Sequence, residues 1–395
     1  MKVLYSFPWS IGESGIGYTA WEQVNELTQL GCEVHLLCGY VQRPFEAPPA
    51  VLHQTMSLKW RKLPAKLLGG MDAAARFHDA RTAAYLRRHR GALQVFHGWP
   101  LASEQSLAEA GRQGVPAFLE RPNTHTEHAY EVTSEVYSNL GIPAPLHASH
   151  RPKPARLARE EREYTAADYL LCPSAAVMES FQCRGYARDK LVPHRYGYSP
   201  TRIATHTARG EGFRAIFIGN DGARKGLHDI LTSWSRSEAT AGGRLDIFGA
   251  LNPEYREHIK PLLNQPGVHY HGFSSDVSAY LSQAHCLLLS SYEEGSALVT
   301  YEARAAGCVL VVSEQSGAIV EHGRTGLVHR AGDIAQLQKH INALYLDRGL
   351  LERLRSASLA DLNTLTWTAS VRALIDTYRT LSAPPQRDSR AVSPG

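Results

Sequence analysis

Two glutamates near the C-terminal end, Glu294 and Glu302, stand where they could bind a ligand. They are eight residues apart, about two helical turns, and segment 297–306 between and beyond them is expected to be helical. The apolar run 286–289 before them is expected to be a buried parallel strand. Unpaired N–H groups and the dipole at a helix start attract anions. If helical geometry reaches back to Glu294, both carboxylates flank such a site on one face; otherwise they are ordinary solvated acids.

A second candidate site is the loop 219–226, where glycines stand beside Arg224 and Lys225 after a strand-like run. Such a loop suits a diphosphate, because its backbone N–H groups and fixed cations can surround the phosphate oxygens. Arg-Lys pairs also occur on plain surfaces, so the sequence leaves both interpretations open.

An earlier glycine pair, Gly15 and Gly17, follows the strand-like run 3–6. With Ala20 it fits the dinucleotide fingerprint, but eight loop residues separate it from that strand. The next strand, 33–38, ends without the acid that binds the ribose of a dinucleotide. A nicotinamide site is therefore disfavoured, and the glycines are expected to let the loop backbone approach a ligand held between domains.

Residues 57–90 are strongly basic, with nine Lys or Arg against two Asp. Apolar residues are interleaved with these charges: Trp60, Leu63, Leu67, Leu68 and Met71. The pattern indicates either an amphipathic element that contacts an anionic membrane or a charged acceptor, or a solvated helix pair that covers the sheet.

Length, charge and composition exclude several classes of protein. A chain of 395 residues suggests two domains, and a net charge of +4 does not require a polyanion, so no nucleic-acid partner is expected. No apolar run reaches the ~18 residues of a transmembrane helix, and the chain enters a strand at once, without a signal peptide. Six scattered cysteines without a C-x-x-C indicate buried free thiols in a reducing compartment, the cytoplasm. The histidines have no metal-ligand spacing, and D-x-D is absent, so no metal is expected.

Strands and helices alternate along both halves of the chain. In the first half, the strand 116–119 is followed by a polar segment, 120–128, that contains His125. Polar residues at this end of a parallel strand are typical of ligand sites in open α/β sheets. Segment 196–212 lacks periodicity and is expected to be a linker.

These features together resemble the retaining GT-B glycosyltransferases of family 4, the group 1 glycosyl transferases. The most specific match is Glu294 to Glu302, the E-x7-E motif of that family, and supporting matches are 217–219 with Lys225, 271–273 and 317–326. The resemblance covers nearly the whole chain. It implies an α/β fold with two doubly wound Rossmann-like domains that face each other across a cleft.

The implied domains are an acceptor-binding domain over 1–197 and a nucleotide-sugar-binding domain over 198–365. A C-terminal helix, 366–384, would cross back to the first domain, and a disordered tail would occupy 385–395.

The resemblance also assigns roles. Glu302 would bind the ribose and Glu294 the donor sugar, Lys225 would grip the diphosphate, and His125 would position donor sugar or acceptor. The catalytic set is thus Glu294, His125 and Lys225. The donor-binding set is Gly15, Gly17, Asn220, Arg224, Lys225, Phe273, Glu294, Ser296, Ala297, Leu298, Val299 and Glu302.

The sequence departs from the family pattern at four places. Asn220 stands where an arginine is usual, and Arg224 is the candidate to supply the missing charge. Ser296 and Ala297 replace the second half of the usual E-G-F-G, and His125 comes later in its loop than the family histidine.

The implied activity is retaining, metal-independent transfer from a UDP- or GDP-sugar to a glycan, lipid-linked or small-molecule acceptor in polysaccharide biosynthesis. The enzyme would be cytoplasmic, with peripheral contact at the inner face of the membrane through 57–90 as one alternative. Two other classes stay open, a GT-B sugar-nucleotide epimerase or hydrolase and a non-catalytic glycan-binding protein on the same fold.

Overall fold

Two parallel sheets with helices on their faces make up the computed structural model, which describes residues 1–58, 61–145, 148, 150–203, 209–210 and 212–382. One sheet has seven strands and the other six. The predicted α/β class with two doubly wound sheets is confirmed.

The seven-stranded sheet has the order β3-β2-β1-β6-β7-β8-β9. Its strands are β1 (Lys2–Ile11), β2 (Glu33–Val41), β3 (Val51–Gln54), β6 (Val95–Gly98), β7 (Ala117–Glu120), β8 (Tyr169–Cys172) and β9 (Leu191–Pro193). β1 runs five residues beyond its predicted end at Ser6, with an irregular register between Phe7 and Ser10.

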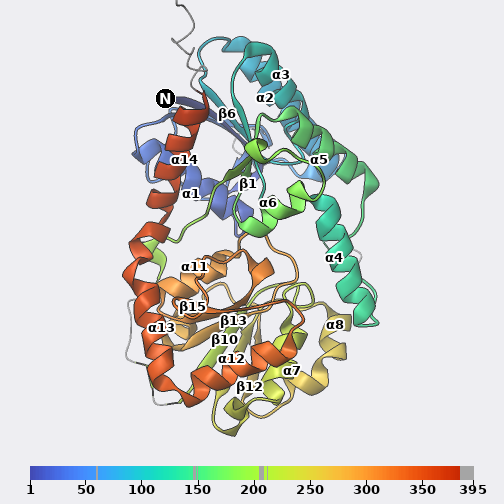
Figure 1. Ribbon diagram of the computed structural model, residues 1–395. Helices are drawn as coiled ribbons and strands as arrows, with labels where there is room; N and C mark the ends of the chain where they lie inside the picture. Colours follow the sequence, from blue (N-terminus) through green and yellow to red (C-terminus); the bar gives the residue numbers. More distant parts are fainter. Residues whose placement is uncertain (59–60, 146–147, 149, 204–208, 211, 383–395) are drawn as a thin grey trace, which may run out of the picture. The chain divides into compact units, whose positions relative to one another are not determined.

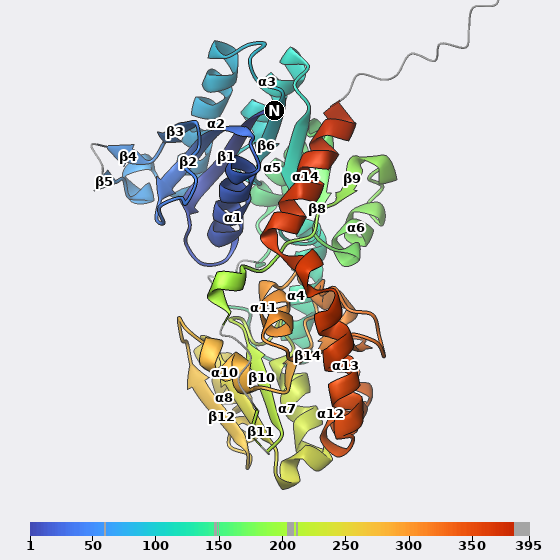
Figure 2. The ribbon, with the colours of Figure 1, turned by 90° about the vertical axis from the view of Figure 1, so that its left-hand side faces the viewer.

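Helices cover both faces of this sheet (Figures 1 and 2). On one face lie α1 (Ile16–Gln29) and α14 (Trp367–Ser382), and on the other α2 (Met71–Arg88), α3 (Glu104–Gln113) and α5 (Pro154–Ala166). Adjacent residues of β1 show the two faces: the Tyr5 hydroxyl donates to Gln23 of α1, whereas Ser6 bonds His78 of α2 at 2.9 Å.

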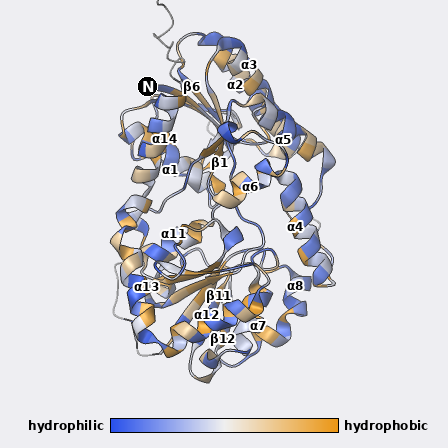
Figure 3. Ribbon diagram, in the orientation of Figure 1, coloured by the Kyte–Doolittle hydropathy of each residue, from blue (hydrophilic) through white to orange (hydrophobic). Residues whose placement is uncertain are grey.

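The six-stranded sheet has the order β12-β11-β10-β13-β14-β15. Its strands are β10 (Arg214–Ile218), β11 (Arg244–Phe248), β12 (Val268–Gly272), β13 (Cys286–Leu289), β14 (Val309–Ser313) and β15 (Gly326–His329). Helices packed around it are α7 (Leu227–Ser235), α8 (Pro253–His258), α9 (Lys260–Leu263), α10 (Ser278–Gln283), α11 (Leu298–Ala305), α12 (Ile334–Leu346) and α13 (Arg348–Ala360). The central strands β13 and β14 are buried on both faces, which explains their continuous apolar sequence (Figure 3).

Contacts divide the chain into two compact units. The first comprises Met1–Glu120, Ala158–Leu171 and α14 from Ser370 onward; the second comprises Arg121–Leu157 and Cys172–Ala369. The second unit therefore includes two helices from the stretch assigned to the first domain by sequence, α4 (Thr126–Asn139) and α6 (Ala175–Gln182). The predicted tail, 385–395, lies outside the described residues.

The described residues of the basic segment 57–90 do not form a helix pair, which was one of the two alternatives predicted for it. It contains the hairpin strands β4 (Ser57–Leu58) and β5 (Arg61–Lys62), a 3-10 turn at Ala65–Leu68, and one helix, α2. Lys59 and Trp60 lie outside the described residues. No helix in the described part of the chain is long and apolar enough to cross a membrane.

All six cysteines are free, as predicted, but only five are buried. Cys183, just after α6, is exposed, which corrects the expectation of six buried thiols.

Candidate active site

Glycines shape the loop between β10 and α7 and place its two cations. A Cβ on Gly219 would come 2.3 Å from Cδ of Lys225, so the lysine stem lies directly over this glycine. Gly226 is left-handed (φ 63°), and a Cβ there would come 2.1 Å from the Ser290 carbonyl oxygen. The loop thus lies against the segment that follows β13, which carries the glutamates.

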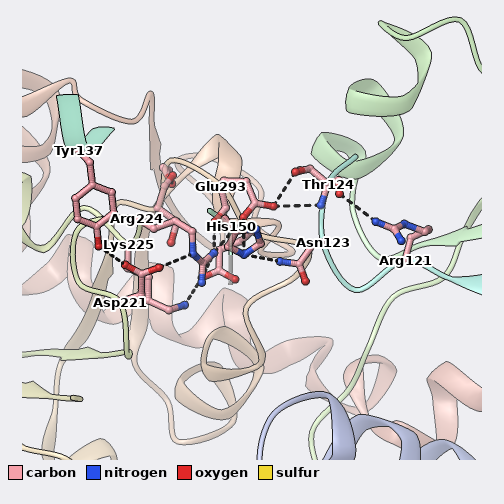
Figure 4. A network of polar contacts seen from close by, with 12 residues as sticks. Arg121, Asn123, Thr124, Tyr137, His150, Asp221, Arg224, Lys225 and Glu293 are labelled. Carbon is pink, nitrogen blue, oxygen red and sulfur yellow. Dashed lines mark hydrogen bonds and ion pairs between the residues drawn. The ribbon is translucent and has the colours of Figure 1, made fainter. Parts of the chain in front are cut away.

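Three charged side chains meet where these loops touch. Lys225 Nζ donates to Glu294 Oε1, and Arg224 Nη1 lies 3.3 Å from the same oxygen. Arg224 is only 9% exposed, so its side chain points inward and is not a solvated surface residue. Figure 4 shows Arg224 and Lys225 within one network of polar contacts.

Both signs of charge are stabilised in this cluster. Burial favours the neutral acid of Glu294, but Arg224 and Lys225 outweigh it and lower its pKa to about 2. Burial also disfavours the charged form of Arg224, yet the carboxylates of Glu294 and Glu293 raise its pKa above the ordinary value. At neutral pH, therefore, the cluster holds full, fixed charges away from bulk water.

A second carboxylate, Glu293, was not singled out by sequence and is fully buried. Its Oε1 accepts hydrogen bonds from the Thr124 N–H (3.2 Å) and hydroxyl (2.7 Å), and its Oε2 lies 3.2 Å from Arg224 Nη1. His150 Nε2 is 3.6 Å from Oε2 and 3.2 Å from Asn123 Nδ2. Glu293 thus joins the 121–124 segment to the cation loop (Figure 4).

The backbone just after Glu293 is also closely packed against the 121–124 segment. A Cβ on Gly295 would come 1.7 Å from the Pro122 carbonyl oxygen, so only glycine fits. The one sequence signal for Glu293 was its place beside Glu294. Nothing in the sequence connects it with Thr124, which lies 169 positions earlier.

Helix α11 begins at Leu298, four residues after Glu294. Helical geometry therefore does not reach Glu294, and the two motif glutamates do not share one helix face. The α11 N-terminus has no side-chain cap. Anion binding by the backbone N–H groups of Leu298 and Val299 stays a prediction.

Ser296 and Ala297 serve the loop itself. The Ser296 hydroxyl donates to the Gly317 carbonyl (3.0 Å) and bonds the Tyr301 hydroxyl (3.0 Å), while the Ala297 N–H donates to the Ser316 carbonyl. The contacts of Ser296 and Ala297 with a sugar-nucleotide donor stay a prediction.

Glu302 lies in the last turn of α11 and lines a small pocket of about 120 Å³. Arg202, Ser275, Val277 and Ser278 also line it. Burial raises the pKa of Glu302, and Arg202 opposes the shift. The pocket offers a carboxylate, hydroxyls and an apolar wall, the groups needed for a ribose.

His125 caps the start of α4, since its Nδ1 accepts the Glu127 N–H at 3.3 Å. The ring is 1% exposed and packs against Phe181 and Tyr186. Burial, with help from nearby arginines, lowers its pKa to about 3, so it is neutral. A neutral, immobilised imidazole can position a ligand but cannot act as a cation.

The remaining predicted residues make other contacts. Gly15 (φ 76°) and Gly17 belong to the first unit, where a Cβ on Gly17 would come 2.6 Å from the Ser10 carbonyl oxygen. Asn220 Oδ1 accepts the Ala250 N–H at 2.8 Å, which ties two strand-end loops together. Phe273 is 69% exposed and precedes Ser275 of the Glu302 pocket.

Two family models match the chain: "Glycosyl transferase 4-like domain" over residues 14–197 and "Glycosyl transferases group 1" over residues 200–360.

Two curated relatives match shorter stretches. A D-inositol 3-phosphate glycosyltransferase of Streptomyces bingchenggensis is 28% identical over 105 residues, 26% of this chain and 23% of that protein. An N,N'-diacetylbacillosaminyl-diphospho-undecaprenol alpha-1,3-N-acetylgalactosaminyltransferase of Campylobacter jejuni is 31% identical over 113 residues, 28% of this chain and 30% of that protein. The match thus spans less than a third of each relative.

Solved structures match along the whole fold. The match to the lipopolysaccharide outer core galactosyltransferase WaaB (16% identity, TM-score 0.68) covers 96% of this chain and 100% of the WaaB chain. The match to sucrose-phosphate synthase from Thermosynechococcus elongatus (17% identity, TM-score 0.70) covers 96% of this chain and 98% of the synthase chain. Anabaena HepE in complex with UDP-glucose (12%, TM-score 0.66) covers 96% and 100%.

Proposed function

The chain belongs to the group 1 glycosyl transferases and has their GT-B fold, and from this premise we propose that it transfers a sugar, with retention, from a UDP- or GDP-sugar to a hydroxyl acceptor. The observation that carries the proposal is the buried contact of Arg224 and Lys225 with Glu294, next to the uncapped start of α11.

This arrangement fits the departure of a nucleoside diphosphate. When the anomeric C–O bond breaks, its electron pair passes to the leaving phosphate oxygen, and fixed cations stabilise that charge without reorganising. The acceptor oxygen forms the new bond from the same face, and its proton passes to the departing phosphate. Lys225 and the α11 N–H groups contact the diphosphate, Glu294 the sugar and Glu302 the ribose, and no divalent metal is required.

Two alternatives differ in what they release. Without an acceptor, a hydrolase would free nucleoside diphosphate rapidly and an epimerase would convert the sugar nucleotide into its epimer, whereas a transferase should do little of either until an acceptor is added. A glycan-binding protein would bind no sugar nucleotide, and a buried cation cluster beside a helix start gives it no advantage.

The direct test is a thermal-shift screen of UDP, GDP and their sugars, with and without EDTA. We expect one nucleotide series to stabilise the protein equally in both conditions. Glu302→Gln should weaken that binding about ten- to a hundredfold, because a hydrogen bond to a charged group contributes ~1.5–3 kcal/mol. Glu254→Gln, on an exposed position of α8, is the control. Unchanged affinity in Glu302→Gln would remove the ribose role, and strict Mg²⁺ dependence would overturn the metal-free site.

We also propose that the basic segment contacts an anionic membrane. Leu67 and Met71 are 74% and 57% exposed, and exposed Arg61, Lys62 and Lys66 lie beside them in sequence. Each cation near an anionic surface contributes roughly 1 kcal/mol. We expect flotation with anionic liposomes that weakens as salt rises, and loss of flotation in Lys62→Glu/Lys66→Glu. If the protein does not bind anionic liposomes at low salt, the remaining interpretation is that the segment only covers the sheet.

A further inference from the structure

A cavity of about 500 Å³ lies beside the cation cluster, within the second unit. Its walls come from α4, α6 and the loops around Tyr292 and Arg330. Tyr292 directly precedes Glu293. The hydroxyl oxygen of Ser180, another lining residue, accepts a hydrogen bond from the backbone N–H of His125 at 2.8 Å. The volume is within the ~300–1,000 Å³ typical of small-molecule sites, so a ligand held here would adjoin the reacting groups.

The aromatic wall is held in place. Tyr292 stacks on His228 with ring centroids 5.8 Å apart and planes 8° from parallel. Its hydroxyl also bonds the buried Asp229 carboxylate. One ring face is therefore covered by protein and the hydroxyl is anchored, so Tyr292 forms a fixed side of the cavity and does not swing into it.

Carboxylates outnumber cations around this cavity. Arg184 is held by two glutamates of α4, with Nε 3.1 Å from Glu127 and Nη2 2.5 Å from Glu131. Glu135 follows on the same helix face, four residues later, and Glu179 comes from α6. Within the described part of the chain, no ion pair joins Glu135 or Glu179 to a cation.

The other charged groups do not reverse this balance. Arg330 is the remaining arginine of the lining. Burial lowers the pKa of His128, with Arg184 adding to the effect, so this ring is neutral at physiological pH. The lining itself has two glutamates, Glu135 and Glu179, and two arginines, Arg184 and Arg330. Because Glu127 and Glu131, outside the lining, pair with Arg184, the charge around the cavity is negative on balance. This charge repels an anionic ligand, whereas carboxylate oxygens accept hydrogen bonds from hydroxyl or ammonium groups.

We propose that this cavity binds the acceptor, and that the part of the acceptor seated here is a polyhydroxylated group, neutral or amine-bearing, without phosphate. The inference rests on the proposed transferase activity and adds the class of its acceptor. Charged groups of a lipid-linked or phosphorylated acceptor would have to lie elsewhere.

Ligand-observed NMR with three probes of one skeleton tests the proposal: glucose, glucosamine and glucose 6-phosphate, each with the intact protein and saturating UDP or GDP. We expect glucose and glucosamine to bind, and glucose 6-phosphate to bind at least about tenfold more weakly because of like-charge repulsion. Glu135→Lys/Glu179→Lys should reverse the order of glucose and its phosphate. Stronger binding of the phosphate by the unaltered protein, or an unchanged order in the variant, would overturn the proposal.

Cys183 gives a readout that does not depend on activity. It lines the cavity and is the exposed cysteine among six. We expect glucosamine to slow its alkylation by iodoacetamide and glucose 6-phosphate to leave the rate unchanged; Cys183→Ser shows that the label is specific. Labelling that no sugar slows would contradict occupancy of the cavity. Nucleotide thermal shifts, measured in the same samples, separate this failure from failure of the proposed transferase.

Discussion

Lys225→Ala should lower the turnover of sugar transfer roughly a hundred- to a thousandfold, since loss of a charge-stabilising donor in a water-excluded site costs ~3 to 4 kcal/mol. The lysine side chain is 13% exposed, paired with Glu294, and supported by Gly219 beneath its stem. Lys225→Met keeps the stem and should lose turnover equally. Steady-state kinetics at saturating acceptor would measure both variants, and donor affinity should fall as well because the ground-state diphosphate is already charged.

Arg224→Ala and Lys260→Ala complete the comparison. Lys260 is exposed and pairs with Glu257, so its loss should change turnover less than about threefold. Arg224 is buried among carboxylates, in the inward orientation that the sequence left open. We therefore expect Arg224→Ala to lower turnover about as much as Lys225→Ala. Near-normal turnover of Lys225→Ala would defeat the placement of the diphosphate at this loop.

Glu293→Ala should cost about 3–5 kcal/mol of unfolding free energy, the usual consequence of removing one partner of a buried ion pair. The substitution leaves the Thr124 hydroxyl without its acceptor and takes one carboxylate from Arg224. Glu293→Gln keeps an acceptor oxygen for Thr124 and should cost less. Urea unfolding would measure the loss of unfolding free energy. Hydrogen exchange at residues 121–124 and 290–297 would show whether these two segments are the ones destabilised.

Glu314→Ala is the matched control, because this glutamate is exposed and follows β14 on a nearby loop. We expect it to stay within about 0.5 kcal/mol of the unaltered protein. A Glu293→Ala protein as stable as this control would mean that the 121–124 segment does not depend on Glu293.

Where burial dictates the residue types, prediction from sequence was accurate. β13 was predicted with its observed bounds because Cys286 to Leu289 are apolar and buried on both faces. β7 was likewise predicted within one residue of its observed bounds, at 116–119 against Ala117–Glu120, since its residues are buried. The short edge strands β9 and β15 were missed, because three or four residues at a sheet edge carry no distinctive period.

Long-range contacts explain the other errors. α4 was not predicted: only its first three residues were included, as the end of the polar segment 120–128, because its sequence is largely polar. The family motif located Glu294 and Lys225, and the structure brings them together. The motif does not include Glu293, His150 or Thr124, because the contacts among these three residues depend on how distant segments pack.

The pairing of Lys225 with Glu294 also affects which cellular anions can occupy the site. Arg224 and Lys225 contact three carboxylates, those of Asp221, Glu293 and Glu294, so the site contains its own counter-ions. An entering anion must exchange with Glu294 for Lys225. Inorganic phosphate has no ribose or sugar with which to compensate for that exchange, whereas a sugar nucleotide has both. Inorganic phosphate should therefore compete poorly with a sugar nucleotide for this site.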